Sequence, residues 1–331
     1  MTSLHSTPST IKQRVIFLVL DGVELLDLAG PAQVFSEADS LGAPYSQHFC
    51  ANTPGVRSAQ GLFLGQLEPL PPSVFGADLV MIAGVALDRL NQPLLDSDTR
   101  RWLINAHANG AQIASICTGA AVLGEAGLLD GRRCTTHWVM VEALQQRYPM
   151  ARVVDGVLYV SDRGIVTSAG VASGIDMALS LVEQQNGPHL AAEVARHLVL
   201  YLRRNGSQPQ QSVYLEYRNH LHPGVHQVQT WLAEHATESV SLAKLAHIAH
   251  MSVRSFSRAF KEATGLTPVQ YHQRLRLEVA AMLLQNSDLS IEAIATQCGF
   301  DDSRHFRRLW RRHFEVSPSV TRKQQTKSPA A

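Results

Sequence analysis

Continuous apolar runs alternate with helical patterns in the first part of the chain. The runs cover Arg14–Leu20, Leu79–Gly84 and Ala111–Ile116. None of them alternates between apolar and polar residues, so we expect strands that are buried on both faces. Helices are predicted from Pro31, taken as a first helical residue, over Asp98–Asn109 and over Gly174–Gln184. With a hairpin at Leu158–Thr167, this pattern predicts an α/β domain whose mainly parallel sheet has helices on both faces.

The last third of the chain is purely helical in pattern, and it repeats. Four residues recur 50 positions later, and three upstream residues recur 49 positions later. The first set is Phe256, Arg258, Phe260 and Pro268, repeated as Phe306, Arg308, Trp310 and Pro318; the second is Leu242, Leu245 and Ala246, repeated as Ile291, Ile294 and Ala295. Two copies of one small unit are therefore predicted.

Each copy reads as two short helices joined by a tight turn. Ser252 is a good N-cap for the second helix of the first copy, and Asp301 or Asp302 serves in the second copy, where Gly299 permits the turn. In both copies the second helix is apolar on one side and basic on the other. This combination is typical of helix-turn-helix units, here at about residues 242–263 and 291–314. The alternative is a helical repeat with solvated arginines.

The chain has 331 residues and a formal net charge of +1, unevenly distributed. Residues 225–331 carry 14 Lys and Arg against 9 Asp and Glu, a net +5, so residues 1–224 carry 15 against 19, a net −4. The basic end is thus the end with the helix-turn-helix pattern. The four cysteines form no CxxC pair, which indicates neither disulfides nor a metal site. We expect Cys50, Cys134 and Cys298 in the core, and His247 and His250 on a helix surface.

The repeat resembles the DNA-binding domain of AraC/XylS transcription regulators. The two stretches that carry the resemblance are LAHIAHMSVRSFSRAFKEATGLTP and IATQCGFDDSRHFRRLWRRHFEVSP. The resemblance implies that a helix at about Tyr271–Gln285 holds two recognition helices in successive major grooves. It also implies a set of base or phosphate contacts. These candidates are Arg254, Ser257, Arg258, Ser303, Arg304, Arg307 and Arg308.

A candidate reactive site lies where the third apolar run ends. Cys117 occupies the turn between that run and a helix of small residues, in the arrangement of a nucleophile elbow. A position at a helix N-terminus is expected to favour the thiolate. Asp27 follows the first strand, and His137 lies 20 residues after the cysteine. Because the carboxyl ends of parallel strands converge, the three side chains are expected in one crevice. The alternatives are a small buried cysteine, a packing histidine and an aspartate that satisfies backbone donors.

Residues 14–185 resemble the PfpI/ThiJ superfamily, also called class I glutamine-amidotransferase-like. The resemblance rests on Leu26-Asp27 with Gly30-Pro31, Cys117-Thr118-Gly119-Ala120, Ala126–Gly131 and Ser168–Gly170. It implies a flavodoxin-like fold, a pocket with Asp27, Cys117, Thr118 and His137, and often a homodimer. Protease-type members carry histidine directly after the cysteine, whereas this chain has Thr118, as the isocyanide-hydratase branch and the sensory domains of AraC-type regulators do.

We expect the following domain order from composition and pattern: a mobile tail at 1–12, a sensing and dimerising domain at 13–188, a connecting helix and linker at 189–224, the DNA-binding domain at 225–324 and a tail at 325–331. The connecting helix is placed at His189–Arg203 and the linker at Ser207–Pro223. The domain then begins with a helix at Gln227–His235. The linker allows either a relay or simple tethering.

The sequence therefore predicts a cytoplasmic, sequence-specific transcription regulator. Its expected partners are double-stranded DNA, a small-molecule effector, RNA polymerase and a second copy of the chain, without a membrane, a metal or a cofactor. A rival hypothesis is a cysteine-dependent hydratase or amidohydrolase with a DNA-binding tail, in which Asp27 is the acid/base and Cys117 the nucleophile. In a third, the α/β domain serves only to dimerise.

Overall fold

The computed structural model describes residues 12–200, 204–206, 210, 217–287, 289–314 and 316–326. The chain divides into two compact units, residues 1–210 and residues 211–331. The predicted tail at 1–12, all but Lys12, lies outside the described residues, as does most of the predicted linker. No helix in the described ranges is both long and apolar enough to cross a membrane.

The first unit is built on a six-stranded sheet with the order β2-β1-β5-β6-β10-β9. All neighbours are parallel except β9 and β10, which form the predicted hairpin. The strands are β1 (Gln13–Leu18), β2 (Tyr45–Cys50), β5 (Leu79–Ile82), β6 (Gln112–Ile116), β9 (Tyr159–Asp162) and β10 (Ile165–Ser168). Two small two-stranded sheets accompany it: β3 (Gly55–Arg57) with β4 (Phe63–Gly65), and β7 (Arg133–Cys134) with β8 (Arg152–Val153).

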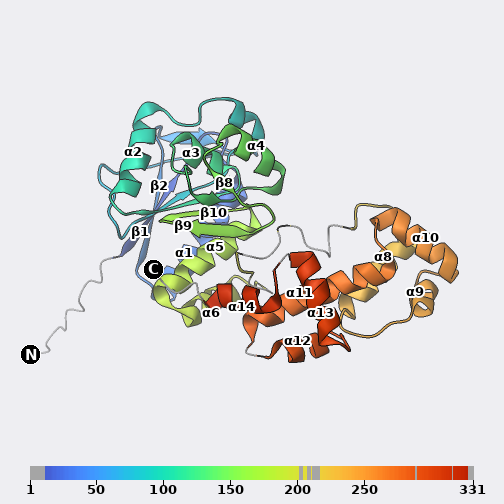
Figure 1. Ribbon diagram of the computed structural model, residues 1–331. Coiled ribbons are helices and arrows are strands. Elements are labelled where there is room, and N and C mark those ends of the chain that lie inside the picture. Colours follow the sequence, from blue (N-terminus) through green and yellow to red (C-terminus); the bar gives the residue numbers. More distant parts are fainter. Residues whose placement is uncertain are drawn as a thin grey trace, which may run out of the picture. The chain divides into compact units, whose positions relative to one another are not determined.

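Helices cover both faces of the sheet, as predicted (Figure 1). On one face lie α1 (Leu25–Ser40), α5 (Ala172–Asn186) and α6 (Pro188–His197); on the other lie α2 (Ser97–Ala108), α3 (Gly119–Glu125) and α4 (Val141–Arg147). Short 3-10 turns, η1 (Leu87–Asn91) and η2 (Trp138–Met140), lie between these elements. Along β1, Val15 and Phe17 pack into one layer while Ile16 and Leu18 pack into the other, which explains the unbroken apolar run.

Two predictions about helices were wrong. The helix α1 begins at Leu25, so Pro31 lies inside it and is not its first residue. Asp27 therefore sits in the first turn of the helix, and proline only removes one hydrogen bond further along. The predicted connecting helix corresponds in its described part to α6, which ends at His197, while residues 201–203 lie outside the described residues. Its Ala191, Val194 and Ala195 pack into the core of the α/β unit. It is thus part of the α/β domain.

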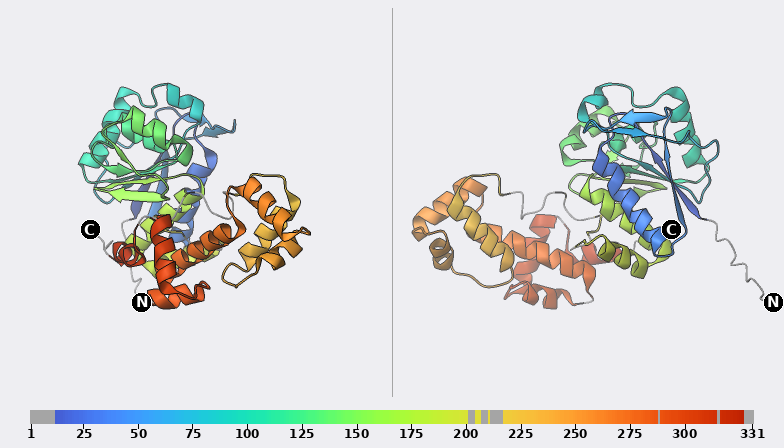
Figure 2. Two further views of the ribbon diagram at one scale, coloured as in Figure 1. Left: turned by 45° about the vertical axis from the view of Figure 1, so that its right-hand side comes forward. Right: turned by 180° about the vertical axis from the view of Figure 1, so that it is seen from behind.

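The second unit is entirely helical in its described residues. Its helices are α8 (Pro223–Glu234), α9 (Leu242–Ile248), α10 (Val253–Thr264), α11 (Pro268–Asn286), α12 (Ile291–Gln297), α13 (Ser303–Phe314) and α14 (Pro318–Thr326). The helix α8 begins at Pro223, inside the predicted linker, and α14 continues two residues into the predicted tail. Figure 2 shows α11 as the long central helix of this unit.

Two separate hydrophobic cores lie along α11. The first subdomain, made of α8, α9 and α10, packs on Tyr271 and Leu275. The second subdomain, made of α12, α13 and α14, packs on the C-terminal half of α11, where Leu277 and Leu284 are buried. The two copies of the sequence repeat are thus two subdomains that share one helix. At 1.5 Å per residue, the 19 residues of α11 span about 28 Å.

Candidate functional site

The first helix-turn-helix unit consists of α9 and α10. Ser241 and Ser252 cap the two helices by accepting hydrogen bonds from Lys244 N and Ser255 N, each at 3.2 Å. Between the helices His250 adopts a left-handed conformation with φ 54°. It therefore lies in the turn, not on a helix surface as predicted, whereas His247 is an exposed residue of α9.

The second unit consists of α12 and α13 and repeats this geometry. Ser290 caps α12, and Asp302 caps α13 by accepting from Arg304 N at 2.9 Å and His305 N at 3.2 Å. The turn residue is Gly299, with φ 74°. In both units the second helix buries two aromatic side chains, each fully removed from solvent. They are Phe256 and Phe260 in α10, and Phe306 and Trp310 in α13.

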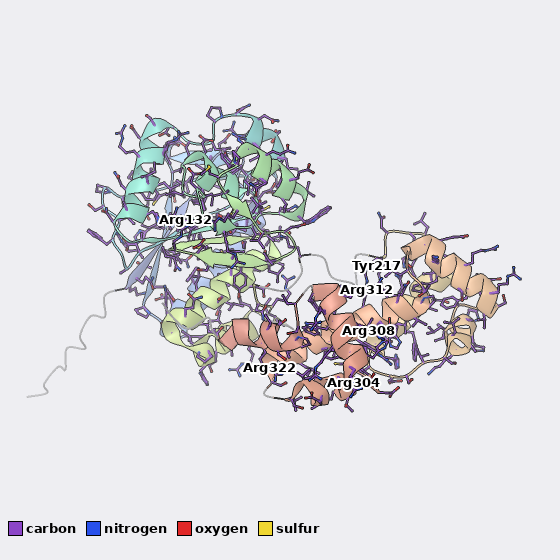
Figure 3. All side chains as sticks on the ribbon, viewed as in Figure 1. Arg132, Tyr217, Arg304, Arg308, Arg312 and Arg322 are labelled. Atoms are coloured by element: carbon purple, nitrogen blue, oxygen red, sulfur yellow. The ribbon has the colours of Figure 1, made fainter. Side chains whose placement is uncertain are left out.

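The predicted DNA contacts lie on the solvent side of α10 and α13. Four arginines are exposed, while Ser257, Ser303 and Arg307 are half-buried. The exposed ones are Arg254, Arg258, Arg304 and Arg308. Figure 3 shows Arg304, Arg308 and Arg312 following one another along α13. Because residues four apart share one helix face, these cations form a continuous basic stripe that suits a phosphate backbone.

Two of these arginines are held by neighbouring side chains. Arg307 forms an ion pair with Glu292 of α12. Arg308 Nη2 lies 3.1 Å from His305 Nδ1 on its own helix. In the first helix-turn-helix unit, Arg258 Nε lies 4.0 Å from Glu262, and Ser257 Oγ donates to Val253 O at 2.8 Å. Arg254 and Arg304 occupy corresponding positions, 50 residues apart, near the start of each second helix.

In the α/β unit the structure brings Asp27 and Cys117 together. Cys117 has φ 57°, the strained backbone of an elbow, and its side chain lies beside the buried carboxyl of Asp27. Asp27 Oδ1 also accepts from Val171 N at 2.7 Å. Two glycines lie against this pair and leave no room for a side chain of their own. A Cβ on Gly84 would lie 2.4 Å from Asp27 Oδ2, and one on Gly170 would lie 2.8 Å from Cys117 Sγ.

The electrostatics of the pair differ from the expectation of a thiolate. Burial, with the nearby Asp27 charge, raises the pKa of Cys117 to about 12, so the thiol stays protonated at neutral pH. The short helix α3 does not overcome this desolvation. Burial likewise raises the pKa of Asp27, against the hydrogen bonds that stabilise its charged form. The other cysteines, Cys50, Cys134 and Cys298, are buried, as predicted.

Thr118 and His137 serve other contacts. Thr118 Oγ1 donates to Val85 O and accepts from Val85 N, both at 2.7 Å, so it ties the loop after β5 to the elbow. His137 is half-buried and, within the described residues, has no hydrogen bond to Asp27 or Cys117; its Nδ1 accepts from Val139 N at 3.4 Å. Burial lowers the pKa of His137. The described ranges contain no cluster of three or more metal-ligating side chains.

Sequence reasoning missed two residues next to this pair. Thr136 Oγ1 donates to Cys117 O at 2.8 Å. Gln210 Nε2 in turn donates to Thr136 O at 3.0 Å and to Val157 O at 2.9 Å. Gln210 lies at the end of the first unit, where the chain leaves for the helical unit. Nothing in the local sequence distinguishes it from the neighbouring glutamines.

Known proteins match both units of the chain. A helix-turn-helix domain family model matches residues 245–324, and the DJ-1/PfpI family model matches residues 76–184. The HTH-type transcriptional regulator CdhR of Pseudomonas aeruginosa is 31% identical over 308 residues, which cover 92% of this chain and 90% of that protein. The chain belongs to the AraC-type family of HTH-type transcriptional regulators.

One further relative has the same kind of name, and one solved structure shares the fold of the α/β unit. The HTH-type transcriptional regulator GlxA of Rhizobium meliloti is 28% identical and covers 96% of this regulator and 98% of its own length. A ThiJ/PfpI family protein from Pseudomonas syringae shares the fold, with 22% identity and a TM-score of 0.53, over 74% of this chain and 92% of that one. The predicted flavodoxin-like unit and AraC-type unit are thereby confirmed, and the comparisons favour the regulator over the rival hydrolytic enzyme.

Proposed function

We propose that this regulator binds an operator in double-stranded DNA by placing α10 and α13 in successive major grooves. The observation that carries the proposal is the pair of capped second helices, each with buried aromatic residues on one side and arginines on the other. The span of α11, about 28 Å, is of the order of the 34 Å that separate successive major grooves.

The two helices divide the work in this proposal. The five arginines of α13 supply contacts to phosphates, which give affinity without sequence preference. The sparser α10 presents Arg254 and Arg258, whose guanidinium forks can bind guanine O6 and N7. Selection of duplexes from a random library, followed by footprinting, tests this directly. Recovery of no preferred sequence would refute sequence-specific binding.

In the α/β unit, the effector binds next to Asp27 and Cys117. The proposal is supported by the strained elbow, by the two glycines that lie against the pair and by two exposed apolar side chains beside the pair, Leu26 and Val171. A protonated thiol suits hydrogen bonding to a ligand better than nucleophilic attack. Thermal shift against a metabolite panel is the first test. A compound that stabilises the wild type but not Asp27→Asn or Cys117→Ala identifies the site.

The effect of ligand binding at this site is transmitted to the DNA-binding unit through Gln210. The hydrogen bonds from Gln210 to Thr136 and from Thr136 to Cys117 join the elbow to the last residue of the first unit. A ligand changes this contact only if it binds one arrangement more tightly than the other. We expect Gln210→Glu, which loses both donors with little change in size, to keep effector binding and DNA binding but to lose the response. An unchanged response would favour simple tethering.

The proposal includes a homodimer, contact with RNA polymerase and a cytoplasmic location, which the family resemblance implies. Sedimentation of the full chain tests the dimer, and transcription in vitro from the selected operator tests the polymerase contact. If pocket substitutions leave regulation intact while truncation of the α/β unit abolishes dimers, that unit serves only to dimerise.

A further inference from the structure

Arg276 occupies the boundary between the two cores of the helical unit. On α11, Leu275 belongs to the core of the first subdomain and Leu277 to the core of the second. The helix α11 connects the two subdomains at this boundary. Long helices are rarely straight and usually curve gently. The relative orientation of α10 and α13 therefore needs a brace at this point.

The side chain of Arg276 contacts both subdomains at once. Its Nε donates to Ala236 O at 3.2 Å, and its Nη2 donates to Glu238 O at 2.9 Å, both in the segment between α8 and α9. Its Nη1 donates to Gly299 O at 2.9 Å, in the turn of the second helix-turn-helix unit. The guanidinium carbon also lies 5.8 Å from the ring centre of Phe300.

The same segments touch directly. A Cβ on Gly299 would lie 2.2 Å from Thr237 O and 3.1 Å from the guanidinium of Arg276. The turn of the second subdomain is thus pressed against the loop of the first, and the left-handed φ of Gly299 is not the only reason for glycine there. Burial lowers the pKa of the Arg276 guanidinium, and the charge of the nearby Asp301 opposes this shift.

We propose that Arg276 is a positioning residue that fixes the angle and separation of the two recognition helices, and so sets which spacing of groove contacts the regulator accepts. Only arginine offers five donors in a rigid planar fork, which three carbonyls from two subdomains can share. Arg276 lies on the central helix and is separate from the basic stripe of α13. Its effect on DNA is therefore exerted through geometry.

The inference rests on the proposed operator binding and makes its own prediction about spacing. A rigid pair of helices matches one separation of groove contacts, because each added base pair moves the second site along and around the duplex. For the wild type we expect one inserted base pair between the two contacted regions to weaken binding at least about tenfold. When the brace is removed, the same insertion weakens binding only about threefold or less, while the selected duplex also binds somewhat less tightly.

The experiment uses the full chain and a duplex selected by the wild type from a random library. Variants of that duplex carry one or two base pairs inserted or deleted between the two footprinted regions. Binding of wild type, Arg276→Ala and Arg276→Lys is measured by fluorescence anisotropy. The lysine variant keeps the charge but not the fork, so its spacing penalty is expected between the other two. Arg274→Ala is the matched control. It also removes a positive charge from α11, but the hydrogen bond that it removes is to Tyr217 of the first subdomain.

The outcomes separate the two proposals. A smaller spacing penalty in Arg276→Ala, with Arg274→Ala like the wild type, supports the brace. Uniformly weaker binding with an unchanged spacing penalty in both Arg276 variants overturns it, because Arg276 then contributes only stability. If Arg276→Ala does not fold, the lysine variant alone decides by the same criterion. Failure of the wild type to select any sequence would instead count against operator binding.

Discussion

The two helix-turn-helix units share their buried positions and differ on their exposed ones. Leu245, Phe256 and Phe260 of the first correspond to Ile294, Phe306 and Trp310 of the second, and all six are buried. On the solvent side, α10 sets three cations against one acid, whereas α13 sets five arginines against none. The core tolerates little change because its volume is fixed, while the exposed face is free to specialise. This difference in charge underlies the proposal that α10 reads the sequence while α13 contacts phosphates.

The turns show the same division. His250 and Gly299 have similar left-handed conformations, and the next residue donates to an alanine carbonyl at 2.9 Å in each unit. In the first unit the turn is exposed, so a histidine side chain is accommodated at some cost in strain. In the second unit the turn presses on Thr237, and no side chain fits. The copies therefore differ where one contacts the other.

The largest expected effect comes from breaking either core. Phe256→Ala and Phe306→Ala should each cost about 3–5 kcal/mol of stability, since both rings are fully buried. Because the cores are separate, we expect hydrogen exchange to rise mainly in the subdomain that carries the substitution. Equal loss of protection in both subdomains would show that they unfold as one body.

Acid should destabilise the first subdomain more than the second. His272 Nε2 lies 2.8 Å from Ala236 O, and burial lowers its pKa to about 4. In the second subdomain, Arg322 contacts Leu289 O. The histidine binds its proton near pH 6.5 in the unfolded chain but only near pH 4 in the folded one. The free energy of unfolding is therefore highest above pH 6.5 and falls as the pH drops from 6.5 to 4. The loss is about 3 kcal/mol at most.

Denaturant melts of the helical unit from pH 7 to pH 4 measure this loss. His272→Gln keeps a donor for Ala236 O but cannot titrate, so it should flatten the pH dependence. A variant with the same slope as the wild type would assign the acid sensitivity to other groups.

The sequence predicts what depends on local period and fails where distant segments decide. The strands β1, β5 and β6 and the two helix-turn-helix units could be predicted, because they follow from the spacing of apolar residues along the local sequence. Pro31 misled because proline favours a helix start but is tolerated within a helix that is held by packing. The protonated state of Cys117 depends on burial and on Asp27, 90 residues away, and the contacts of Gln210 and Arg276 depend equally on tertiary structure.

Charge removal should separate the proposed roles of α10 and α13. Arg308→Ala is expected to weaken binding to all sequences and to lower the slope of log K against log salt by about 0.9, as for one lost phosphate contact. Arg258→Ala is expected to relax the sequence preference, at a cost of about 1–3 kcal/mol on the selected duplex. Titrations of the selected and a scrambled duplex at several salt concentrations measure both quantities. The division of work fails if both variants change the salt slope alike and leave the preference intact.

The smallest effect concerns an ion pair that only the second unit has. Glu292 binds Arg307, whereas the corresponding residues of the first unit are Ala243 and Ser257. The pair is solvent-exposed, so it should matter little for stability. It nevertheless places an acid beside the basic stripe and holds one arginine away from other partners. Glu292→Ala, which copies the first unit, should therefore tighten DNA binding about threefold at low salt, and the gain should fade as salt screens the charge. In Arg307→Ala the same change at Glu292 should bring a smaller gain, because the arginine to be released is gone. An equal gain in both backgrounds would mean that Glu292 acts only through its charge.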